Sequence, residues 1–210
     1  MAAVNSRQQI AAEETQRAIV EAAARLFAER GYHATSIATI AAEAGVAVQT
    51  IYNAVGGKSA ILARVLDFSV AGERAPVPVA QFMREQAEQE PDPVRIIGQM
   101  VEFWTGAMPR SAPVQRMIRE AAAVDPEAAL LERRRAAQRL RNYGQAASIL
   151  DERGALREGL SVDDAAAAIF AIGHPETYRA LVVDGGWDDS RWAAWAQAAL
   201  VAALLGPRSG

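Results

Sequence analysis

Residues 32–62 read Tyr-His-Ala-Thr-Ser-Ile-Ala-Thr-Ile-Ala-Ala-Glu-Ala-Gly-Val-Ala-Val-Gln-Thr-Ile-Tyr-Asn-Ala-Val-Gly-Gly-Lys-Ser-Ala-Ile-Leu, and this stretch decides the fold. Thr35 and Ser36 carry hydroxyl groups that can cap the start of a helix. Gly45 stands where a chain leaving a helix needs a positive φ. Between them, apolar residues recur at helical spacing, at Ile37, Ile40, Ala41 and Ala44. The pattern predicts a short helix followed by a tight turn.

A second helix is predicted directly after this turn, over residues 47–53. Val46 plugs the corner between the two helices, and either Thr50 or Ile51 faces inward. The outward positions are then Val48, Gln49, Tyr52 and Asn53. A helix presented in this way fits the major groove of DNA, with its N-terminal residues nearest the base edges. The two helices therefore predict a helix-turn-helix that binds DNA.

Two flanking helices complete the predicted N-terminal domain. The upstream helix ends at Gly31 and has a buried stripe of Ile19, Ala23, Leu26 and Phe27. The downstream helix follows a break at Gly56 and Gly57, and its first turn holds Lys58, the chain's only lysine. Its inner face is marked by Ile61, Leu62, Val65, Leu66 and Phe68.

These segments closely resemble the DNA-binding domain of the TetR family of one-component transcriptional repressors, over about residues 15–70. The family pattern Ala-x-x-Leu-Phe-x-x-x-Gly-Tyr is matched by Ala23 to Tyr32, and Tyr-x-x-x-x-x-Lys by Tyr52 to Lys58. Two positions depart from the pattern, because Ala47 replaces a capping Ser and Val55 replaces a Phe. The resemblance implies phosphate contacts from Ser36, Thr50, Tyr52 and Lys58, and base reading by Val48 and Gln49, with Asn53 beside them.

Each of these positions also has an interpretation that needs no DNA. Tyr52 can be a packed aromatic residue, Gln49 a solvated side chain and Lys58 a surface charge. Lys58, however, lies near a helix start, where the macrodipole disfavours a cation, and this placement favours a nearby phosphate. Charge gives no further support, since residues 1–75 carry as many basic as acidic side chains and the whole chain has a net charge of −3. Binding would depend on directed contacts and helix N-termini.

Length and composition indicate two domains in a folded chain. The 210 residues are 51% hydrophobic, which excludes global disorder. We expect a flexible tail at residues 1–12, the DNA-binding domain at 13–74 and a helical regulatory and dimerisation domain at 75–210, with the boundary at Ala75-Pro76-Val77-Pro78. The chain has no cysteine and only two histidines, which predicts no disulfide, metal site or cofactor. It also has no signal-type segment, which predicts a cytoplasmic protein.

The remaining sequence predicts further helices and no strands, so the predicted fold class is all-α. Helix starts are marked by Asp92-Pro93, Asp125-Pro126, Ser161 with Asp164, and Asp188. Pro109 and Pro113 are expected to bracket a break, followed by a separate short helix containing Val114, Met117 and Ile118. The long helix opened by Asp125-Pro126 is expected to end near Gly154.

The family resemblance implies that the last two helices pair two copies of the chain. Alanine residues there would let helices approach closely, and Trp192 and Trp195 would supply area to bury. The alternative is that these residues pack within one chain. A single DNA-binding domain of this size seldom binds DNA tightly, which favours a homodimer.

An apolar small-molecule site is expected in the C-terminal domain. Its proposed lining consists of Met100, Phe103, Trp104, Met108, Met117, Tyr143, Phe170 and His174. The alternative is that this stripe is ordinary core and that His174, which precedes Pro175, bonds to backbone at a helix break.

We expect no enzyme. Gly56-Gly57-Lys58-Ser59 resembles the end of a phosphate-binding loop, but the earlier glycine and the preceding strand are missing. His174, Asp184 and Ser190 lack a nucleophile elbow. The sequence therefore predicts a homodimeric regulator, a repressor released from a palindromic operator by a small apolar ligand. The alternatives are a transcriptional activator or a ligand-independent DNA-binding module.

Overall fold

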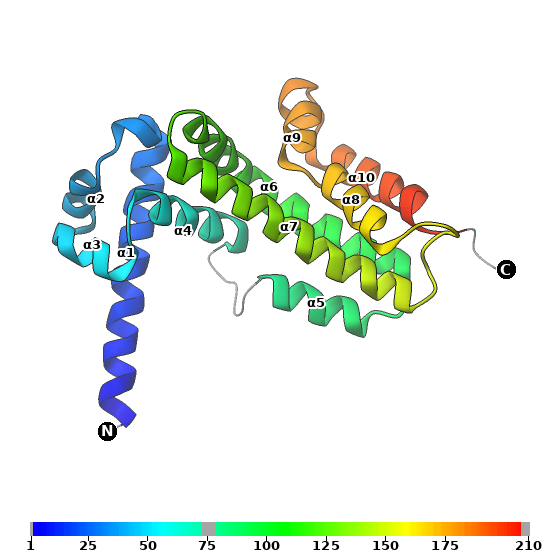
Figure 1. Cartoon of the computed structure of the whole chain (residues 1–210), viewed down its shortest axis with the longest axis horizontal. Coiled ribbons are helices and arrows are strands. Elements are labelled where there is room, and N and C mark those ends of the chain that lie inside the picture. The colour runs from blue at the N-terminus through cyan, green and yellow to red at the C-terminus, as the bar shows by residue number, and fades with distance from the viewer. Residues whose placement is uncertain (1, 73–78, 207–210) are drawn as a thin grey trace. The chain divides into compact units, whose positions relative to one another are not determined.

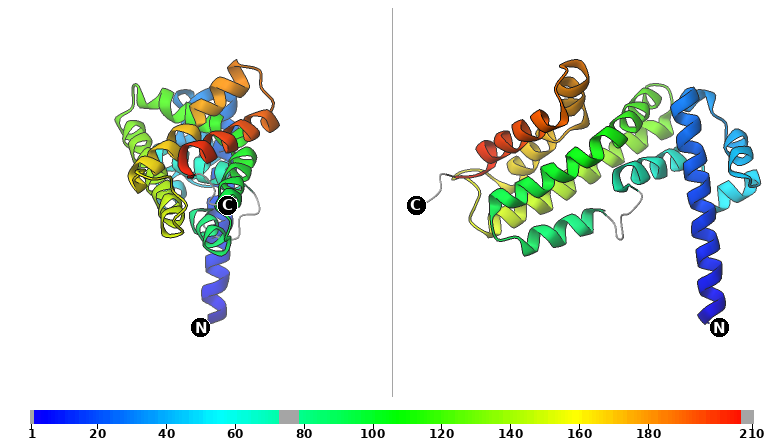
Figure 2. Two further views of the ribbon diagram at one scale, coloured as in Figure 1. Left: turned by 90° about the vertical axis from the view of Figure 1, so that its right-hand side faces the viewer. Right: turned by 180° about the vertical axis from the view of Figure 1, so that it is seen from behind.

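The computed structural model describes residues 2–72 and 79–206, and every regular element in these ranges is a helix (Figures 1 and 2). Extended pairing within them is confined to one isolated bridge between Leu156 and Leu205. The predicted all-α class is confirmed. The chain forms two compact units: unit 1 comprises Met1–Ser69 and Val114–Glu132, and unit 2 comprises Val70–Pro113 and Arg133–Gly210.

Unit 1 is built around the predicted helix-turn-helix. It contains α1 (Ala2–Ala34), α2 (Ile37–Ala44), α3 (Val48–Ala54), most of α4 (Lys58–Ala71), and the parts of α6 and α7 on either side of their connecting turn. The helices α1, α2 and α3 pack against one another. The side chains with no exposed surface include Ile19, Ile40, Ile51, Ile61 and Leu62. The predicted apolar stripes thus form one small core, which fixes α3 by its inner face.

The local signals of the helix-turn-helix act as predicted. Ser36 Oγ accepts a hydrogen bond from the Thr39 N–H at 3.0 Å and caps α2. Gly45 closes α2 with a φ of 68°, a left-handed conformation that favours glycine. Ala47 precedes α3 and provides no side-chain cap.

The start of the chain differs from the prediction. Residues 2–12, expected to be a flexible tail, belong to α1, which begins at Ala2. The segment contains four alanines and two glutamines, residue types with high helix propensity, so α1 extends beyond the part that packs in the core. Gly31, the predicted end of this helix, leaves helical geometry with φ 78° and ψ 165° before a last turn to Ala34.

Unit 2 holds the remaining helices around an aromatic and aliphatic core. They are α5 (Val79–Gln89), the first part of α6 (Pro93–Ala122), the last part of α7 (Pro126–Glu152), α8 (Val162–Ile172), α9 (Pro175–Tyr178), the π-helix η1 (Arg179–Asp184) and α10 (Asp189–Leu204). The helices α8 and α10 lie side by side (Figures 1 and 2). Core side chains without exposure include Ile97, Leu150, Ile169, Trp192 and Leu200.

The predicted helix starts are confirmed by their caps. Asp92 accepts a hydrogen bond from the Val94 N–H at 2.9 Å, and Asp125 accepts one from the Glu127 N–H at 2.8 Å. Ser161 caps α8 through the Asp164 N–H at 3.1 Å, and Asp188 caps α10 through the Arg191 N–H at 2.7 Å.

The predicted break at Pro109 and Pro113 is wrong, because α6 runs unbroken from Pro93 to Ala122 with both prolines inside it. Each proline removes one backbone hydrogen bond. The helix persists because its inner face stays buried there, with Met108 5% and Ser111 2% exposed, while both prolines lie at exposed positions. The prolines mark a different boundary, since unit 2 ends at Pro113 and unit 1 resumes at Val114.

Residues 114–132 group with the N-terminal helices, whereas the sequence interpretation assigned them to the C-terminal domain. Their contacts with the N-terminal helices include hydrogen bonds from Tyr32 to Asp125 and from Ser59 to Glu127, each 3.0 Å long. The predicted boundary at residues 75–78 lies outside the described residues.

Candidate DNA-binding surface

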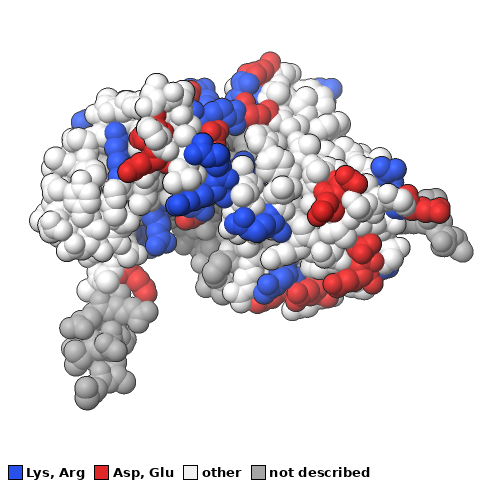
Figure 3. All heavy atoms as spheres, in the orientation of Figure 1, with Lys and Arg blue, Asp and Glu red and all other residues white. Residues whose placement is uncertain are grey.

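The helix α3 presents the four predicted side chains on one exposed face. Val48 is 41% and Tyr52 50% exposed, Gln49 and Asn53 are exposed as well, and Ile51 anchors the opposite face with no exposed surface. On the side of unit 1 drawn in Figure 3, the area over α2 and α3 is almost free of charged side chains. An exposed valine and tyrosine on a short, firmly anchored helix are suited to contact with base edges and sugar-phosphate.

Two of these side chains, Gln49 and Asn53, are hydrogen-bonded to each other. Gln49 Nε2 donates to Asn53 Oδ1 at 3.0 Å across one turn of α3. This bond limits the rotamers of Gln49, and it must be exchanged when the amide pairs with a base. Ser36 is exposed but its hydroxyl lies 2.8 Å from Thr39 Oγ1, and Thr50 is half-buried.

Lys58 is half-buried at the start of α4 and has partners inside the protein. Its Nζ lies 4.2 Å from the centroid of the Tyr32 ring and donates to the His33 carbonyl oxygen at 3.4 Å. Burial lowers the pKa of the ammonium group, and attraction to Asp125 opposes that shift. The helix dipole alone therefore does not require a phosphate at Lys58, because the ring, the carbonyl and the carboxylate already stabilise the charge.

Sequence reasoning missed Tyr32 and Asp125, the residues that lie behind Lys58. Tyr32 is 5% exposed, and its hydroxyl donates to Asp125 Oδ2 at 3.0 Å. Burial and the bond to Asp125 raise the pKa of Tyr32 well above its usual range. Burial would also raise the pKa of Asp125, but hydrogen bonds from Tyr32 and from the Glu127 and Ala128 N–H groups outweigh it and lower that pKa. The two residues are 93 positions apart, so local sequence patterns carry no signal for their contact.

Seven of the eight predicted ligand residues lie in unit 2, and the eighth, Met117, lies in unit 1. The structure therefore does not bring the predicted set together within one unit. Within unit 2, four of them form a series of ring contacts: centroid distances are 5.7 Å from Trp104 to Tyr143, 6.4 Å from Tyr143 to Phe170 and 5.3 Å from Phe170 to His174. We call these four residues the ring series.

The ring series and its neighbours are densely packed. Met100, Trp104 and Met108 are 8%, 3% and 5% exposed, while Phe103 is partly buried. A Cβ atom added at Gly173 would lie 2.3 Å from Trp104 Cη2. Burial raises the pKa of Tyr143 to about 12, although the Arg139 charge and a hydrogen bond with Trp104 oppose the shift. These observations are those of an aromatic core.

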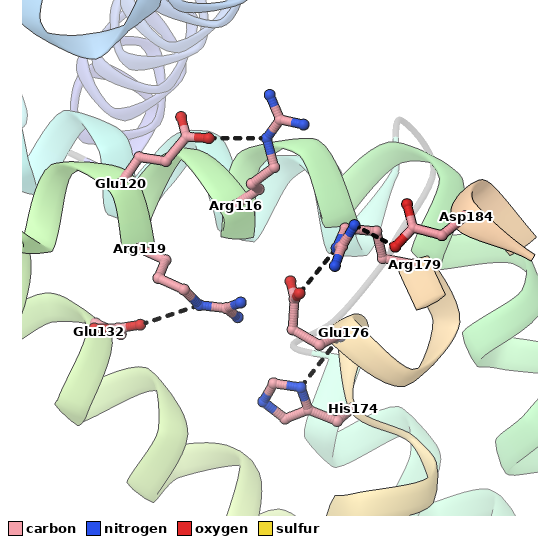
Figure 4. Close-up of polar contacts among 8 residues, drawn as sticks. All are labelled: Arg116, Arg119, Glu120, Glu132, His174, Glu176, Arg179 and Asp184. Atoms are coloured by element: carbon pink, nitrogen blue, oxygen red, sulfur yellow. Dashed lines mark hydrogen bonds and ion pairs between the residues drawn. The ribbon is translucent and has the colours of Figure 1, made fainter. Parts of the chain in front are cut away.

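His174 occupies the alternative position considered for it. Its Nδ1 accepts a hydrogen bond from the Glu176 N–H at 3.2 Å, and the residue caps α9 (Figure 4). Arg179 pairs with Glu176 at 2.9 Å and with Asp184 at 2.6 Å, which holds the turn between α9 and η1. Figure 4 also draws two ion pairs of unit 1, Arg116 with Glu120 and Arg119 with Glu132.

The proposed dimer helices also differ from the prediction. Trp192 has no exposed surface, so it packs within its own unit and cannot supply area to a second copy, whereas Trp195 is half-buried. The exposed side of α8 and α10 is instead formed by small residues one helical turn apart, namely Ala167 and Ala171 on α8, and Ala194, Ala198 and Ala202 on α10. We call these five residues the alanine face.

No helix within residues 2–72 and 79–206 is long and apolar enough to cross a membrane. The same part of the chain contains no group of three or more His, Cys, Asp or Glu side chains that could hold a metal ion.

Residues 19–65 match the family model described as "Bacterial regulatory proteins, tetR family". No curated protein sequence matches the chain.

Solved structures share the fold over nearly the whole chain. FadR of Bacillus subtilis, a transcriptional regulator in complex with stearoyl-CoA, is 21% identical, with a TM-score of 0.70 over 89% of this chain and 98% of that one. The fatty acid degradation regulator FadR of Bacillus halodurans is 20% identical, with a TM-score of 0.65 over 89% and 94%. A protein of Saccharomonospora viridis, described as a transcriptional regulator in complex with choline, is 20% identical, with a TM-score of 0.68 over 93% and 100%. Residues 19–65 thus carry the sequence pattern of this family of regulatory proteins, and the chain shares the fold of these solved structures over 89% of its length or more.

Proposed function

We propose that the protein is a cytoplasmic, homodimeric repressor that binds a palindromic operator and releases it when a small apolar ligand binds unit 2. The observation that carries the DNA-binding part is the exposed face of α3, anchored by Ile51 and presenting Val48, Gln49, Tyr52 and Asn53. Ser36, Thr50 and Lys58 are the proposed phosphate contacts beside it. The family model over residues 19–65 supports a regulator rather than an enzyme.

Selection of bound fragments from random DNA with the purified full-length chain tests this proposal. A repressor dimer should enrich a palindrome whose half-sites are about 10–10.5 base pairs apart, or a multiple of that distance. Footprinting of the enriched duplex should protect both half-sites. Enrichment of no sequence, together with equal affinity for all duplexes, would contradict a sequence-specific regulator.

The alanine face supports the homodimer. Small residues one turn apart let two helices approach closely, and a second copy presents the same face about a two-fold axis. Ala198→Arg places a long charged side chain in this face and should give monomers that bind the palindrome weakly. Ala137→Arg, at an exposed position of α7, is the matched control and should leave the dimer intact. A dimer that persists with Ala198→Arg, measured by sedimentation, would place the interface elsewhere.

The ligand part is supported by the apolar ring series and by the relatives. FadR of Bacillus subtilis is described with stearoyl-CoA and the Saccharomonospora viridis protein with choline. An apolar ligand would have to enter unit 2 beside the ring series, and the proposed lining residues within that unit are Met100, Phe103, Trp104, Met108, Tyr143, Phe170 and His174.

Titration of the operator complex with stearoyl-CoA and, separately, with choline distinguishes an apolar from a cationic ligand. An apolar site should release DNA with stearoyl-CoA, and Tyr143→Ala or Phe103→Ala should weaken that response while ligand-free DNA binding stays unchanged. By reciprocity, operator DNA must weaken ligand binding by the same factor. Release by choline alone would contradict an apolar ligand.

A further inference from the structure

The feature that the proposed function leaves unused is a chain of contacts inside unit 1, from Asp125 through Tyr32 to Lys58. Asp125 lies in the turn between α6 and α7 and caps α7 through the Glu127 N–H at 2.8 Å. Its other carboxylate oxygen accepts the Tyr32 hydroxyl at 3.0 Å, and the Tyr32 ring lies under the Lys58 ammonium group at 4.2 Å. Asp125, Tyr32 and Lys58 are therefore linked by two direct contacts.

The geometry fixes Lys58 from two sides. The ammonium group donates to the His33 carbonyl at 3.4 Å, and the neighbouring Ser59 hydroxyl donates to Glu127 Oε2 at 3.0 Å. The first turns of α4 and α7 are therefore joined by two polar connections, one through Tyr32 and Asp125 and one through Ser59 and Glu127. A flexible four-carbon lysine side chain is held in a narrow range of positions as a result.

We propose that Asp125 and Tyr32 are positioning residues for Lys58, so that the turn between α6 and α7 sets the strength of the lysine's contact with DNA phosphate. The proposal deepens the proposed function and rests on it for the DNA contact. Because α6 and α7 continue along the chain into unit 2, this turn is one place at which a displacement of either helix would reach Tyr32 and Lys58. The proposal has two states, one with the hydrogen bond between Tyr32 and Asp125 formed and one with it broken.

Lys58 is the chain's only lysine, which provides a readout that needs no DNA. Acylation of the amine by an N-hydroxysuccinimide ester, followed by mass spectrometry of the peptide containing Lys58, measures its freedom directly, with the α-amino group as internal reference. Tyr32→Phe removes the bond to Asp125 but keeps the ring. Asp125→Asn keeps a good cap for α7 but removes the charge. Each should speed Lys58 acylation roughly three- to tenfold, the factor that corresponds to one hydrogen bond.

Tyr178→Phe is the matched control. Tyr178 makes the same kind of bond, to Asp189 Oδ1 at 2.6 Å, but in unit 2. It should leave Lys58 acylation unchanged. If Tyr32→Phe does not fold, which circular dichroism reveals, Asp125→Asn carries the test once rates are compared at equal fractions of neutral amine, because loss of the Asp125 charge by itself lowers the pKa of Lys58. Unchanged Lys58 acylation in the folded variants overturns the proposal whether or not the protein binds DNA.

A double-mutant cycle on the selected duplex then tests the connection to DNA. Tyr32→Phe should weaken binding roughly three- to tenfold in the wild-type background and have no effect in the Lys58→Ala background, because it acts through that side chain. Equal losses in both backgrounds would overturn the positioning role. If acylation responds as expected but the wild-type protein binds no duplex, the proposed function fails while the positioning of Lys58 stands.

Discussion

The exposed face of α3 and the ring series of unit 2 are the two regions to which function was assigned, and they are built in opposite ways. On α3 the assigned side chains point away from the core, and Tyr52 is 50% exposed. In the ring series Trp104 is 3% exposed and the other three rings are half-buried. A DNA-binding surface is complete in the free protein, whereas a site among packed rings requires those rings to move apart.

The exposure of a side chain supports a functional assignment more strongly on α3 than in the ring series. Val48 and Tyr52 are one turn apart on the exposed face of α3, so together they form a small apolar patch of the kind that marks an interaction site. Buried aromatic residues need no interaction to explain them, since they contribute to the core wherever they lie. The DNA-binding face is therefore the firmer of the two proposals.

The largest expected effect comes from Trp192→Ala. Trp192 has no exposed surface and contacts the rings of Trp104 and Tyr178, with centroid distances of 6.4 and 5.1 Å. Its truncation should lower the free energy of unfolding by about 3–5 kcal/mol, measured by chemical denaturation. The half-buried Trp195 is the control, and Trp195→Ala should cost clearly less. Equal losses would mean that the rings of unit 2 are looser than their packing indicates.

Gly173→Ala should destabilise unit 2 by about 1–3 kcal/mol, because its Cβ would lie 2.3 Å from Trp104 Cη2 and force that ring to move. Gly144→Ala, on α7, has no atom within 4 Å of the added Cβ and should stabilise by about 0.4–1 kcal/mol. Thermal denaturation of the pair measures both. If Gly173→Ala is neutral, Trp104 has room to move, and the case for a ligand site beside it becomes stronger.

The fold was largely predictable because its signals are local. Ser36, Gly45, Asp92, Ser161 and Asp188 each act on backbone groups within four residues, so their roles can be read from spacing alone. The prediction of a break at Pro109 and Pro113 was wrong, because both lie at exposed positions of α6 while its opposite face stays buried. Local propensity is a weaker influence than burial at such positions.

The candidate site was predictable only in part, for the same reason. The outward positions of α3 follow from helical periodicity. The partners of Lys58 do not, because Tyr32 and Asp125 meet only after the chain has folded. The buried position of Trp192 and the placement of Met117 in unit 1 likewise depend on tertiary packing, which no periodic pattern encodes.

A smaller effect on the DNA-binding side should come from Gln49→Ala. If Gln49 reads a base edge, its loss should reduce discrimination at one position of the half-site by about 1–3 kcal/mol, while binding to unrelated DNA stays the same. Competition between the selected duplex and single-base variants measures this. Asn53→Ala separates base reading from support, since it removes the 3.0 Å bond to Gln49 but leaves the glutamine in place. A uniform loss of affinity for every duplex would assign Gln49 to the backbone instead.

The smallest effect is a gain. Ala47 has extended geometry, with φ −73° and ψ 149°, and its carbonyl oxygen accepts the Thr50 N–H at 2.9 Å, but no side chain satisfies the first N–H groups of α3. Ala47→Ser should supply that missing acceptor and raise the free energy of unfolding of unit 1 by about 1 kcal/mol.

The same substitution at Ala38, an exposed position inside α2, is the control for Ala47→Ser, and there serine should cost a few tenths of a kcal/mol through its lower helix propensity, about 0.5 at most. Differential scanning calorimetry resolves changes of this size as shifts in Tm. A gain at Ala47 alone would mean that local capping limits the stability of α3. No gain would mean that the buried Ile51 already fixes the helix, so that the DNA-binding face depends on its core as completely as the ring series does.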